Sequence, residues 1–435
     1  MIISVVGGGL AGSEAAWQAS RSGMKVRLYE MRPAKSSAAH KTGCLGELVC
    51  SNSLRSDDPV TPSGVLKREL EMAGSLIMES ARINSVPAGS ALAVDRNLFS
   101  EYISDMIADN PYIEIIRKEV SSIPAGCCVV ATGPLTSEAM ASAIGSLVDS
   151  RYLYFHDAIA PIVSADSIDF SKAFYASRYG KGSADYINCP MEEDEYNIFY
   201  DELIKADRVN LKEFDNIRVF QGCMPVEVMA ERGRDSLRFG PMKPVGLTDP
   251  LTGKMPYAVV QLRAENRYRS AYNMVGFQCR IKWPEQRRVF RLIPGLEHGE
   301  FLRYGSIHRN TFINSPLFIS NDLSFSARSD VYIAGQLSGV EGYLESTAIG
   351  LVAGINASGN LLGLKYVPVP ETTAHGALVR YITESGSRNF QPGNINIGLF
   401  PPLDGKIKDK KLKRKKIAER ALQDWREYLD KLKDR

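Results

Sequence analysis

Residues 2–30 read IISVVGGGLAGSEAAWQASRSGMKVRLYE. The β-branched run at residues 2–6 predicts a strand, and the glycine-rich turn after it leads directly into a helix. Residues 25–30 alternate as a second strand and end in an acid, Glu30, which follows Gly12 by 18 positions. This order of strand, glycine turn, helix, strand and acid is the pattern of a dinucleotide-binding βαβ unit.

Each glycine of this turn has its own expected role. Gly7 allows the tight turn, Gly9 lets the backbone approach a pyrophosphate, and Gly12 lets the helix pack closely on the strand. Glu30 is expected to accept a hydrogen bond from a ribose hydroxyl. Because the unit occupies the first residues of the sequence, we expect FAD, whose enzymes usually hold the ADP half there. The predicted cofactor-binding residues of this unit are Gly7, Gly8, Gly9, Leu10, Ala11, Gly12 and Glu30.

A second strand with a glycine turn and a helix lies late in the chain. Residues 331–334 read as a strand that leads into Gly335 and Gln336, and Tyr343 opens a helix of small residues. Amides at a helix N-terminus can face the flavin, whose reduced ring is anionic. We therefore predict Gly335, Gln336 and Tyr343 as further cofactor-binding residues. Tyr343 either stacks on the ring or covers the helix N-terminus, and the sequence favours the two uses about equally.

These elements belong to a domain that another domain interrupts. The alternation of strands and helices breaks between residues 160 and 304. The sequence predicts an α/β fold, a discontinuous Rossmann-like FAD-binding domain with an inserted α/β domain. The expected boundaries are 1–160 for the first part of the FAD-binding domain, 161–304 for an inserted substrate or RNA domain, 305–403 for the second part and 404–435 for a basic C-terminal helix or tail.

Length and composition agree with this arrangement. The chain has 435 residues, 44% hydrophobic and 24% charged, which indicates at least two globular domains and excludes collagenous, coiled-coil and wholly disordered classes. The formal net charge is only +3, so a polyanion would have to be met by local basic patches. The 7 cysteines lack CxxC spacing, which predicts reduced thiols in a cytoplasmic protein and no metal site. No apolar run suggests a membrane span.

Two of the thiols are candidates for chemistry. Cys50 lies in the polar segment ELVCSNSLRSD near Arg55, which favours a thiolate, although a single cysteine is more often a packing residue. Cys223 precedes Pro225, the expected first residue of a helix that Gly233 closes, and the positive end of that helix would lower the thiol pKa. The other thiols are interpreted as structural at Cys127, Cys128 and Cys279 and are left unassigned at Cys44 and Cys189.

Nine blocks of the sequence, taken in order, resemble the TrmFO family of folate- and FAD-dependent tRNA (uracil-5-)-methyltransferases. They include ELVCSNSLRS, RYGKGSADYINCPM, FQGCMPVEVMAERGRDSLRFGPMKPVGL and GQLSGVEGYLEST, and the resemblance covers roughly residues 1–400. The larger GidA-type tRNA-modifying flavoproteins share only the flavin framework with these blocks. Residues 40–46 depart from the family pattern, which more often has His-Thr-Asp and an aromatic residue there, and they add Cys44 as an extra thiol.

The resemblance implies that a one-carbon unit passes from 5,10-methylenetetrahydrofolate to C5 of a uridine in the tRNA T-loop, position 54 in tRNA numbering. NADPH or NADH would reduce the flavin, which supplies a hydride. The same resemblance makes Cys223 the nucleophile at C6 and Cys50, near the flavin, the general base at C5. The alternatives are the same chemistry on a ribosomal RNA uridine, a general NAD(P)H flavin oxidoreductase, or a non-enzymatic flavin-bearing RNA-binding protein.

Two segments are candidates for contact with RNA. Residues 263–291 combine eight basic residues and two acids with several aromatics, a composition that fits an RNA-binding surface as well as a sheet with one solvated basic face. Residues 406–416 hold eight basic residues in eleven, which is often only a solvated run of charge. An amphipathic helix is predicted after this run, with its apolar residues at Ile417, Ala421, Trp425, Tyr428 and Leu432.

Overall fold

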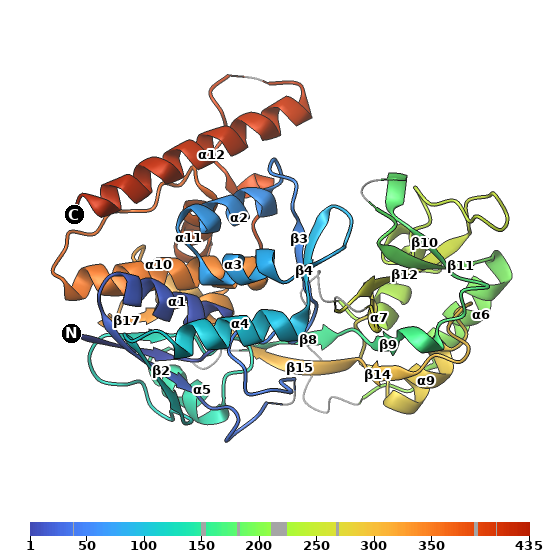
Figure 1. Cartoon of the computed structure of the whole chain (residues 1–435), viewed down its shortest axis with the longest axis horizontal. Helices are drawn as coiled ribbons and strands as arrows, with labels where there is room; N and C mark the ends of the chain where they lie inside the picture. Colours follow the sequence, from blue (N-terminus) through green and yellow to red (C-terminus); the bar gives the residue numbers. More distant parts are fainter. Residues whose placement is uncertain are drawn as a thin grey trace.

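The structure is a computed structural model of the whole chain, and Figure 1 shows two units joined by a pair of strands. One unit, here the parallel-sheet unit, combines segments from both ends of the chain, and the other, here the inserted unit, is built from the middle. The residues that the structure describes are 1–37, 39–148, 154–180, 183–209, 224–266, 269–386, 390–405 and 407–435.

The parallel-sheet unit is built on six strands in the order β16-β17-β7-β1-β2-β6. β1 lies between β2 and β7 and pairs with both in parallel, while β16 closes one edge in antiparallel. Strands from residues 2–130 and 324–333 thus share one sheet, which confirms the predicted α/β fold with an interrupted Rossmann-like sheet. The strands are β1 (Ile2–Val6), β2 (Lys25–Glu30), β6 (Ile113–Arg117), β7 (Cys128–Val130), β16 (Ser324–Phe325) and β17 (Arg328–Ile333).

Two helices with small residues cover this sheet at very close range. Helix α1 (Leu10–Arg21) packs along α10 (Tyr343–Leu361). A Cβ atom at Gly350 would lie 2.2 Å from the carbonyl oxygen of Ala11, and one at Gly354 would lie 2.5 Å from that of Ala15. Only glycine fits at these two crossings, so the small residues of α10 place its N-terminus beside the glycine turn of α1. The other helices of the unit are α2 (Pro62–Met72), α3 (Leu76–Ile83), α4 (Arg96–Ala108), α5 (Glu138–Gly145), α11 (Ala374–Glu384) and α12 (Lys410–Lys433).

Smaller elements connect the two units. A three-stranded sheet of β3 (Ser53–Ser56), β5 (Ala91–Val94) and β4 (Ser85–Val86) lies on the side of the parallel-sheet unit that faces the inserted unit. β8 (Tyr154–Ile159) and β15 (Ser306–Thr311) pair in antiparallel and run between the units (Figure 1). Short 3₁₀ turns occur at Ala165–Ser167, Arg178–Gly180, Ser315–Leu317, Gly335–Ser338 and Ile397–Leu399.

The inserted unit has an antiparallel sheet with two different faces. Along β12, Leu262 and Ala264 belong to an apolar core, whereas Arg263 lies on the other face and contacts the parallel-sheet unit. This alternation is the period of two that a strand requires. The sheet order is β10 (Phe174–Ala176), β11 (Tyr186–Met191), β12 (Ala258–Ala264), β13 (Ala271–Met274), β9 (Ile162–Ser164) and β14 (Phe301–Arg303). The helices are α6 (Glu193–Lys205), α7 (Val226–Ala230), α8 (Ser236–Phe239) and α9 (Trp283–Phe290).

For residues 263–291 the sequence left two interpretations open, an RNA-binding surface and a sheet with one solvated basic face, and the structure bears on the aromatic residues of the first interpretation. Tyr272, Phe277 and Phe290 are buried in the apolar core of the inserted unit, so these three rings are not available to stack on bases. Trp283 is 62% exposed, while Arg267 and Tyr268 lie outside the described residues. The exposed charges that remain are Arg269, Lys282, Arg287 and Arg288.

The C-terminal segment forms a helix that belongs to the core of the parallel-sheet unit. Trp425 is fully buried, donates from Nε1 to the carbonyl oxygen of Glu69 at 2.7 Å and stacks on the ring of His375. The predicted apolar positions Ile417, Ala421 and Trp425 are all buried, which confirms the amphipathic pattern. No helix in the described part of the chain combines the length and apolar character that a membrane span needs.

Candidate active site

The glycine turn after β1 contains two glycines that close packing requires and one that faces open space. Gly7 has φ +104°, and a Cβ there would lie 2.5 Å from the carbonyl oxygen of Ala131. A Cβ at Gly12 would lie 1.7 Å from the carbonyl oxygen of Gly7, which explains why α1 can pack so closely on the turn. A Cβ at Gly9 would have no protein atom within 4 Å. Gly9 therefore leaves space that a ligand, and not the protein, can occupy.

A cleft opens at the carboxyl ends of β1, β2 and β7, the edge where open α/β sheets bind ligands. It holds about 1000 Å³ of space free of protein atoms, open solvent included. Its lining combines both glycine elements with the ends of the strands. Predicted cofactor-binding residues in the lining are Gly7, Gly9, Leu10, Ala11, Glu30, Gly335, Gln336 and Tyr343. Gly8 and Gly12 lie in the same turn without lining the cleft.

Glu30, the predicted ribose partner, is the centre of a buried ionic network. Its Oε2 accepts from the amide of Gly8 at 2.8 Å, and its Oε1 accepts from Nε of Arg32 at 2.9 Å. Arg32 also donates to Glu47 at 2.8 Å, so one guanidinium joins two carboxylates that are each less than one-tenth exposed. Burial works to raise the pKa of Glu30, but the hydrogen bonds and charge of Arg32 outweigh it, and the pKa is lowered. Glu30 is therefore a fixed anion at the cleft.

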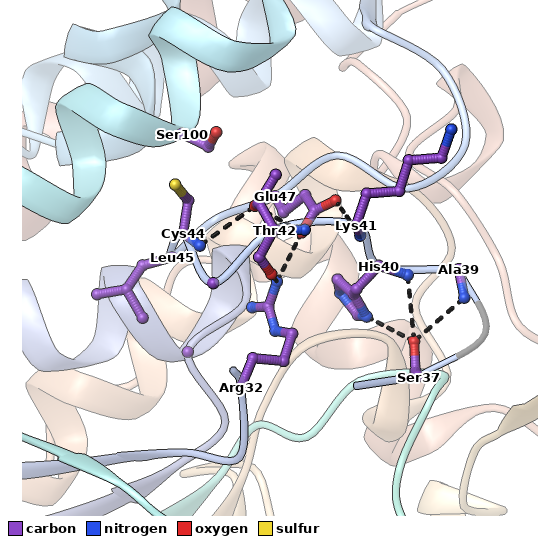
Figure 2. Close-up of polar contacts among 12 residues, drawn as sticks. Arg32, Ser37, Ala39, His40, Lys41, Thr42, Cys44, Leu45, Glu47 and Ser100 are labelled. Carbon is purple, nitrogen blue, oxygen red and sulfur yellow. Dashed lines mark hydrogen bonds and ion pairs between the residues drawn. The ribbon is translucent and has the colours of Figure 1, made fainter. Parts of the chain in front are cut away.

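Figure 2 shows how Glu47 organises the loop beside this network. Its carboxylate accepts from the amides of Lys41 and Thr42 and from the hydroxyl of Thr42. The side chain of Lys41 extends away from the carboxylate, and Cys44 lies on the opposite side of the loop from His40. The segment that departs from the family pattern is thus tied to the cleft through its backbone, and Cys44 is a half-buried thiol outside the cleft lining.

Tyr343 joins the cleft to the loop that carries Cys50. It is the first residue of α10, lines the cleft, and accepts at its hydroxyl from the amides of Cys50 at 2.8 Å and Ser51 at 3.1 Å. Burial raises the pKa of Tyr343, so the phenol stays protonated. Gly335 begins the 3₁₀ turn before this helix with φ +70°, and a Cβ there would lie 2.7 Å from Cβ of Ala11. The late glycine element therefore lies directly against the first one, and both line the cleft.

Guanidinium groups surround residues 48–52, here the Cys50 loop, but the arginine expected from the sequence, Arg55, is not among them. Arg55 makes an ion pair with Glu345 on α10 instead of facing Cys50. Arg96 donates to the carbonyl oxygens of Leu48 and Cys50, and Arg303 donates to those of Val49 (3.2 Å) and Cys50 (2.9 Å). These two cations come from different units, Arg96 from α4 and Arg303 from β14.

A third guanidinium holds the next residues of the loop. Arg263 donates from Nε to Oδ1 of Asn52 at 3.0 Å and from its terminal nitrogen to Oγ of Ser51 at 2.6 Å. Asn52 returns a hydrogen bond to the carbonyl oxygen of Ala264 at 2.8 Å. The Cys50 loop therefore lies between the two units and is held by both.

Cys223 lies outside the described residues, and its position is not part of this geometry. The helix after it is shorter than the expected one: α7 covers Val226–Ala230 with Pro225 as its N-cap. A five-residue helix aligns few peptide dipoles, so the argument that this helix lowers the thiol pKa loses its main physical support.

The remaining described thiols differ sharply from Cys50. Burial raises the pKa of Cys127 to about 12 and that of Cys189 to about 12, and it also raises the pKa of Cys128 and Cys279. These four side chains are buried, which confirms the structural interpretation of Cys127, Cys128 and Cys279 and assigns Cys189 to the same class. Cys50 is half-buried and lies among cations.

The arrangement fits a dinucleotide by its backbone donors and its empty space. The glycine turn leads into the N-terminus of α1, whose free amides suit a pyrophosphate, and Gly9 leaves room for it. Glu30 is a fixed anion, and anionic carboxylates accept hydrogen bonds from ribose hydroxyls. The cleft and the adjoining Cys50 loop bring the phenol of Tyr343, which lines the cleft, next to the residue that carries a thiol.

Sequence reasoning missed the side chains that complete this site. Arg32 follows Glu30 by two positions, and the local pairing of opposite charges was a usable signal. Arg96, Arg263 and Arg303 reach the Cys50 loop through tertiary structure, and no spacing in the sequence connects them. Other lining residues that local patterns did not indicate include His40, Glu47, Thr132, Thr136 and Ser137.

Comparisons with known proteins agree with this geometry. Residues 2–365 match the model of the family described as glucose inhibited division protein A. Methylenetetrahydrofolate–tRNA-(uracil-5-)-methyltransferase TrmFO of Natranaerobius thermophilus is 55% identical over 432 residues, 99% of this chain and 100% of that protein. The protein of the same name from Pelotomaculum thermopropionicum is 53% identical over 433 residues, 99% of this chain and 98% of that protein. Aquifex aeolicus GidA in its form II crystal shares the fold, with a TM-score of 0.70 at 17% identity over 98% of this chain and 73% of that one.

Proposed function

The chain belongs to the TrmFO family, and we propose on that basis that it methylates C5 of a uridine in the T-loop of tRNA, using 5,10-methylenetetrahydrofolate as carbon donor. The observation that carries the proposal is 53–55% identity over 99% of the chain to proteins of that name. The dinucleotide cleft and the adjoining Cys50 loop support it, because the reaction needs a redox cofactor and a thiol in one site.

We infer that the dinucleotide is FAD. Gly9 and the N-terminus of α1 would hold its pyrophosphate, Glu30 its ribose, and the start of α10 would approach its ring. When bound and reduced by NADPH or NADH, the flavin supplies the hydride that turns an exocyclic methylene on C5 into a methyl group. The cleft walls and Tyr343 would keep water from this hydride.

We assign the two thiols of the proposed reaction to different protons and bonds. The thiolate of Cys223 adds to C6 of uracil and gives C5 the electron density to form a bond with the methylene carbon of the folate. Cys50 then accepts the proton from C5, and the bond between the methylene carbon and the folate nitrogen breaks as the exocyclic double bond forms and tetrahydrofolate leaves. When hydride adds to the methylene carbon, the C5–C6 double bond re-forms and the bond between sulfur and C6 breaks, which frees the thiolate of Cys223. The arginines around the Cys50 loop support this assignment because positive charge favours the thiolate that a base requires.

For the RNA, we propose that the basic first half of α12 contacts phosphates. Lys410, Lys411, Lys413, Arg414, Lys415 and Lys416 are exposed there. The buried residues of the helix begin at Ile417, and α12 contacts α2, so the exposed basic run is the first part of a helix that is anchored further along. The proposal also places the protein in the cytoplasm, together with its tRNA substrate.

The test is to incubate the purified, FAD-loaded protein with methylenetetrahydrofolate, NADPH and total RNA, and to map new 5-methyluridine by mass spectrometry of RNA fragments. The proposal predicts methylation of a T-loop uridine in tRNA. Methylation of ribosomal RNA alone would favour the first alternative. NADPH oxidation without any methylated RNA would favour a general flavin oxidoreductase, and RNA binding without either reaction would favour a non-enzymatic protein.

A further inference from the structure

Two arginines of the inserted unit hold the Cys50 loop from one side by hydrogen bonds, in addition to ordinary packing. We propose that Arg263 and Arg303 are positioning residues through which docking of the inserted unit fixes and charges Cys50. The inference rests on the proposed role of Cys50 as a base and adds the groups that control it. It makes the thiol reactive only while the two units are in contact.

The sheet register places both arginines on one face. Arg263 on β12 pairs with Asn273 on β13, Asn273 pairs with Ile162 on β9, and Ile162 pairs with Arg303 on β14. Cross-strand partners project to the same side of a sheet, so the two guanidiniums lie on the face opposite to Leu262 and the apolar core. This face meets residues 48–52.

A local irregularity in β14 directs Arg303 to that face. Phe301 pairs with Val163 and packs against the apolar core, whereas Arg303, two residues later, already pairs with Ile162, the next residue on β9. Residues two apart on a regular strand would share a face, so the register shift turns Arg303 to the other side. Such a shift re-aims one side chain, and here it aims a guanidinium at the carbonyl oxygens of Val49 and Cys50.

The charge near the loop is not balanced. Four cations lie at or near it, Arg96, Arg263, Arg303 and Lys41, against two acids, Glu265, which pairs with Arg96, and Glu47, which lies near Lys41. Within the described part of the chain, Oε1 of the buried Glu265 and Nε of Arg303 have no hydrogen-bond partner. Burial lowers the pKa of Arg263 because it removes water from the guanidinium, and Tyr343 adds a neutral phenol. An additional negative charge at Cys50 would relieve this excess.

Arg96 contributes to the same excess against its own local preference. It is the first residue of α4, where the positive end of the helix dipole favours an acid over a base. Its guanidinium is used on the Cys50 loop and on Glu265. Arg96 thus departs from the preference for an acid at a helix N-terminus, and it does so where three cations meet. This departure indicates that the site requires positive charge.

The consequence is a link between the two units. Arg263 and Arg303 belong to the inserted unit, while Cys50 and Tyr343 belong to the parallel-sheet unit. If the inserted unit moves away, the loop loses its hydrogen bonds to Arg263 and Arg303 and two of the four cations near it, and Arg96 loses its partner Glu265. Cys50 then behaves as an ordinary, mostly protonated thiol, and it does not react beside a reduced flavin.

The test follows the alkylation of Cys50 by iodoacetamide in the full-length, FAD-loaded protein without RNA or folate. Mass spectrometry of the Cys50 peptide gives the rate between about pH 6 and 10, because only the thiolate reacts. In Arg303→Gln we expect the pH midpoint of this rate to rise by about one unit and the rate at pH 7 to fall about tenfold. Arg303 is half-buried, so this variant should fold. Arg303→Lys keeps the charge and should move the midpoint less.

The matched control is Arg291→Gln. Arg291 is also a half-buried arginine of the inserted unit that donates to a carbonyl oxygen, that of Gly299, but it does not contact the Cys50 loop. An unchanged midpoint in Arg303→Gln, or an equal shift in Arg291→Gln, would overturn the inference. The proposed base is tested separately: methylation that persists in Cys50→Ala would refute that role whatever the alkylation profile shows.

Discussion

The two sheets of this protein contribute to one site in different ways. The parallel sheet uses its backbone: Gly7 and Gly12 sit where any side chain would strike a main-chain atom, and Gly9 leaves space for a ligand. The inserted sheet uses side chains: Arg263 and Arg303 extend from one of its faces to hold residues 48–52. A site built from backbone depends on glycines that are adjacent in sequence, and a site built from side chains depends on strand register.

This difference predicts different consequences of substitution. In the parallel-sheet unit, one added methyl group should remove either the fold or the cofactor, according to the glycine chosen. In the inserted unit, substitutions on the polar face should leave the fold intact and change the reactivity of a thiol in the other unit.

Gly12→Ala should have the largest effect. The added Cβ would lie 1.7 Å from the carbonyl oxygen of Gly7, a backbone atom that cannot move without displacing the turn. We expect the free energy of unfolding to fall by about 3 kcal/mol or more, together with the loss of FAD. Urea unfolding and flavin absorbance after gel filtration measure both. A stable, yellow Gly12→Ala protein would contradict the close packing of α1 on the turn.

Gly9→Ala should separate cofactor binding from folding. The added methyl group meets no protein atom within 4 Å but enters the space of the cleft. We expect wild-type unfolding of the FAD-free protein and a weakening of FAD binding by about tenfold or more, which corresponds to about 1.4 kcal/mol. Titration of the FAD-free protein with FAD gives the dissociation constant. Equal FAD affinity in wild type and variant would remove the pyrophosphate from this position.

Glu30 should show its effect in the pH dependence of stability. Its pKa is lowered in the folded protein, so its contribution is present above the unfolded value and is lost as pH falls through the folded one. We expect Glu30→Gln to cost about 2 kcal/mol above about pH 5, and the difference from wild type to shrink below about pH 4. Urea midpoints across this range measure it. A difference that stays constant down to pH 3 would mean that the carboxylate charge contributes nothing.

Exposed charges on α12 should have the smallest effect and only on RNA binding. We expect replacement of Lys411, Lys413, Arg414 and Lys415 by Gln to reduce the slope of log affinity for tRNA against log salt by about 2, with unchanged stability. Deleting the helix would remove the buried Trp425 and confuse binding with folding. Gln at Lys431 and Lys433, exposed at the other end of α12, is the control. Equal slopes in all three proteins would make the basic run a solvated surface.

The contrast also explains how much could be predicted from the sequence. The first strand, its glycine turn, Glu30 and the late glycine element with Tyr343 were predicted, because each depends on neighbours in the sequence. Arg263 was grouped with exposed basic residues, since its burial depends on the alternation of β12 and on contact with Asn52. The position of Arg303 depends on a register shift in β14 that no local pattern indicates.

The aromatic residues of the basic stretch show the same limit. Tyr272 and Phe290 lie on a strand and on a helix of the same core, so residues close in sequence are separated by a change of secondary structure. Composition alone could not decide whether they form one exposed surface. For Cys50, closeness in the sequence indicated Arg55 as the neighbouring cation, but in the structure the Arg55 side chain pairs with Glu345.

The central claim is the division of labour between two thiols, and covalent trapping tests it most directly. A labelled T-arm RNA with 5-fluorouridine at the target position is incubated with methylenetetrahydrofolate and FAD-loaded protein, then run on a denaturing gel. Fluorine at C5 cannot leave as a proton, so the adduct at C6 should persist. Cys44→Ala, which removes a half-buried thiol outside the cleft lining, is the control.

The account predicts an adduct in wild type, in Cys44→Ala and in Cys50→Ala, and none in Cys223→Ala. Cys50→Ala should also fail to methylate ordinary T-arm RNA, because proton removal follows the addition of the nucleophile. An adduct that survives in Cys223→Ala and disappears in Cys50→Ala would reverse the two roles, and no adduct in any lane would refute the covalent mechanism.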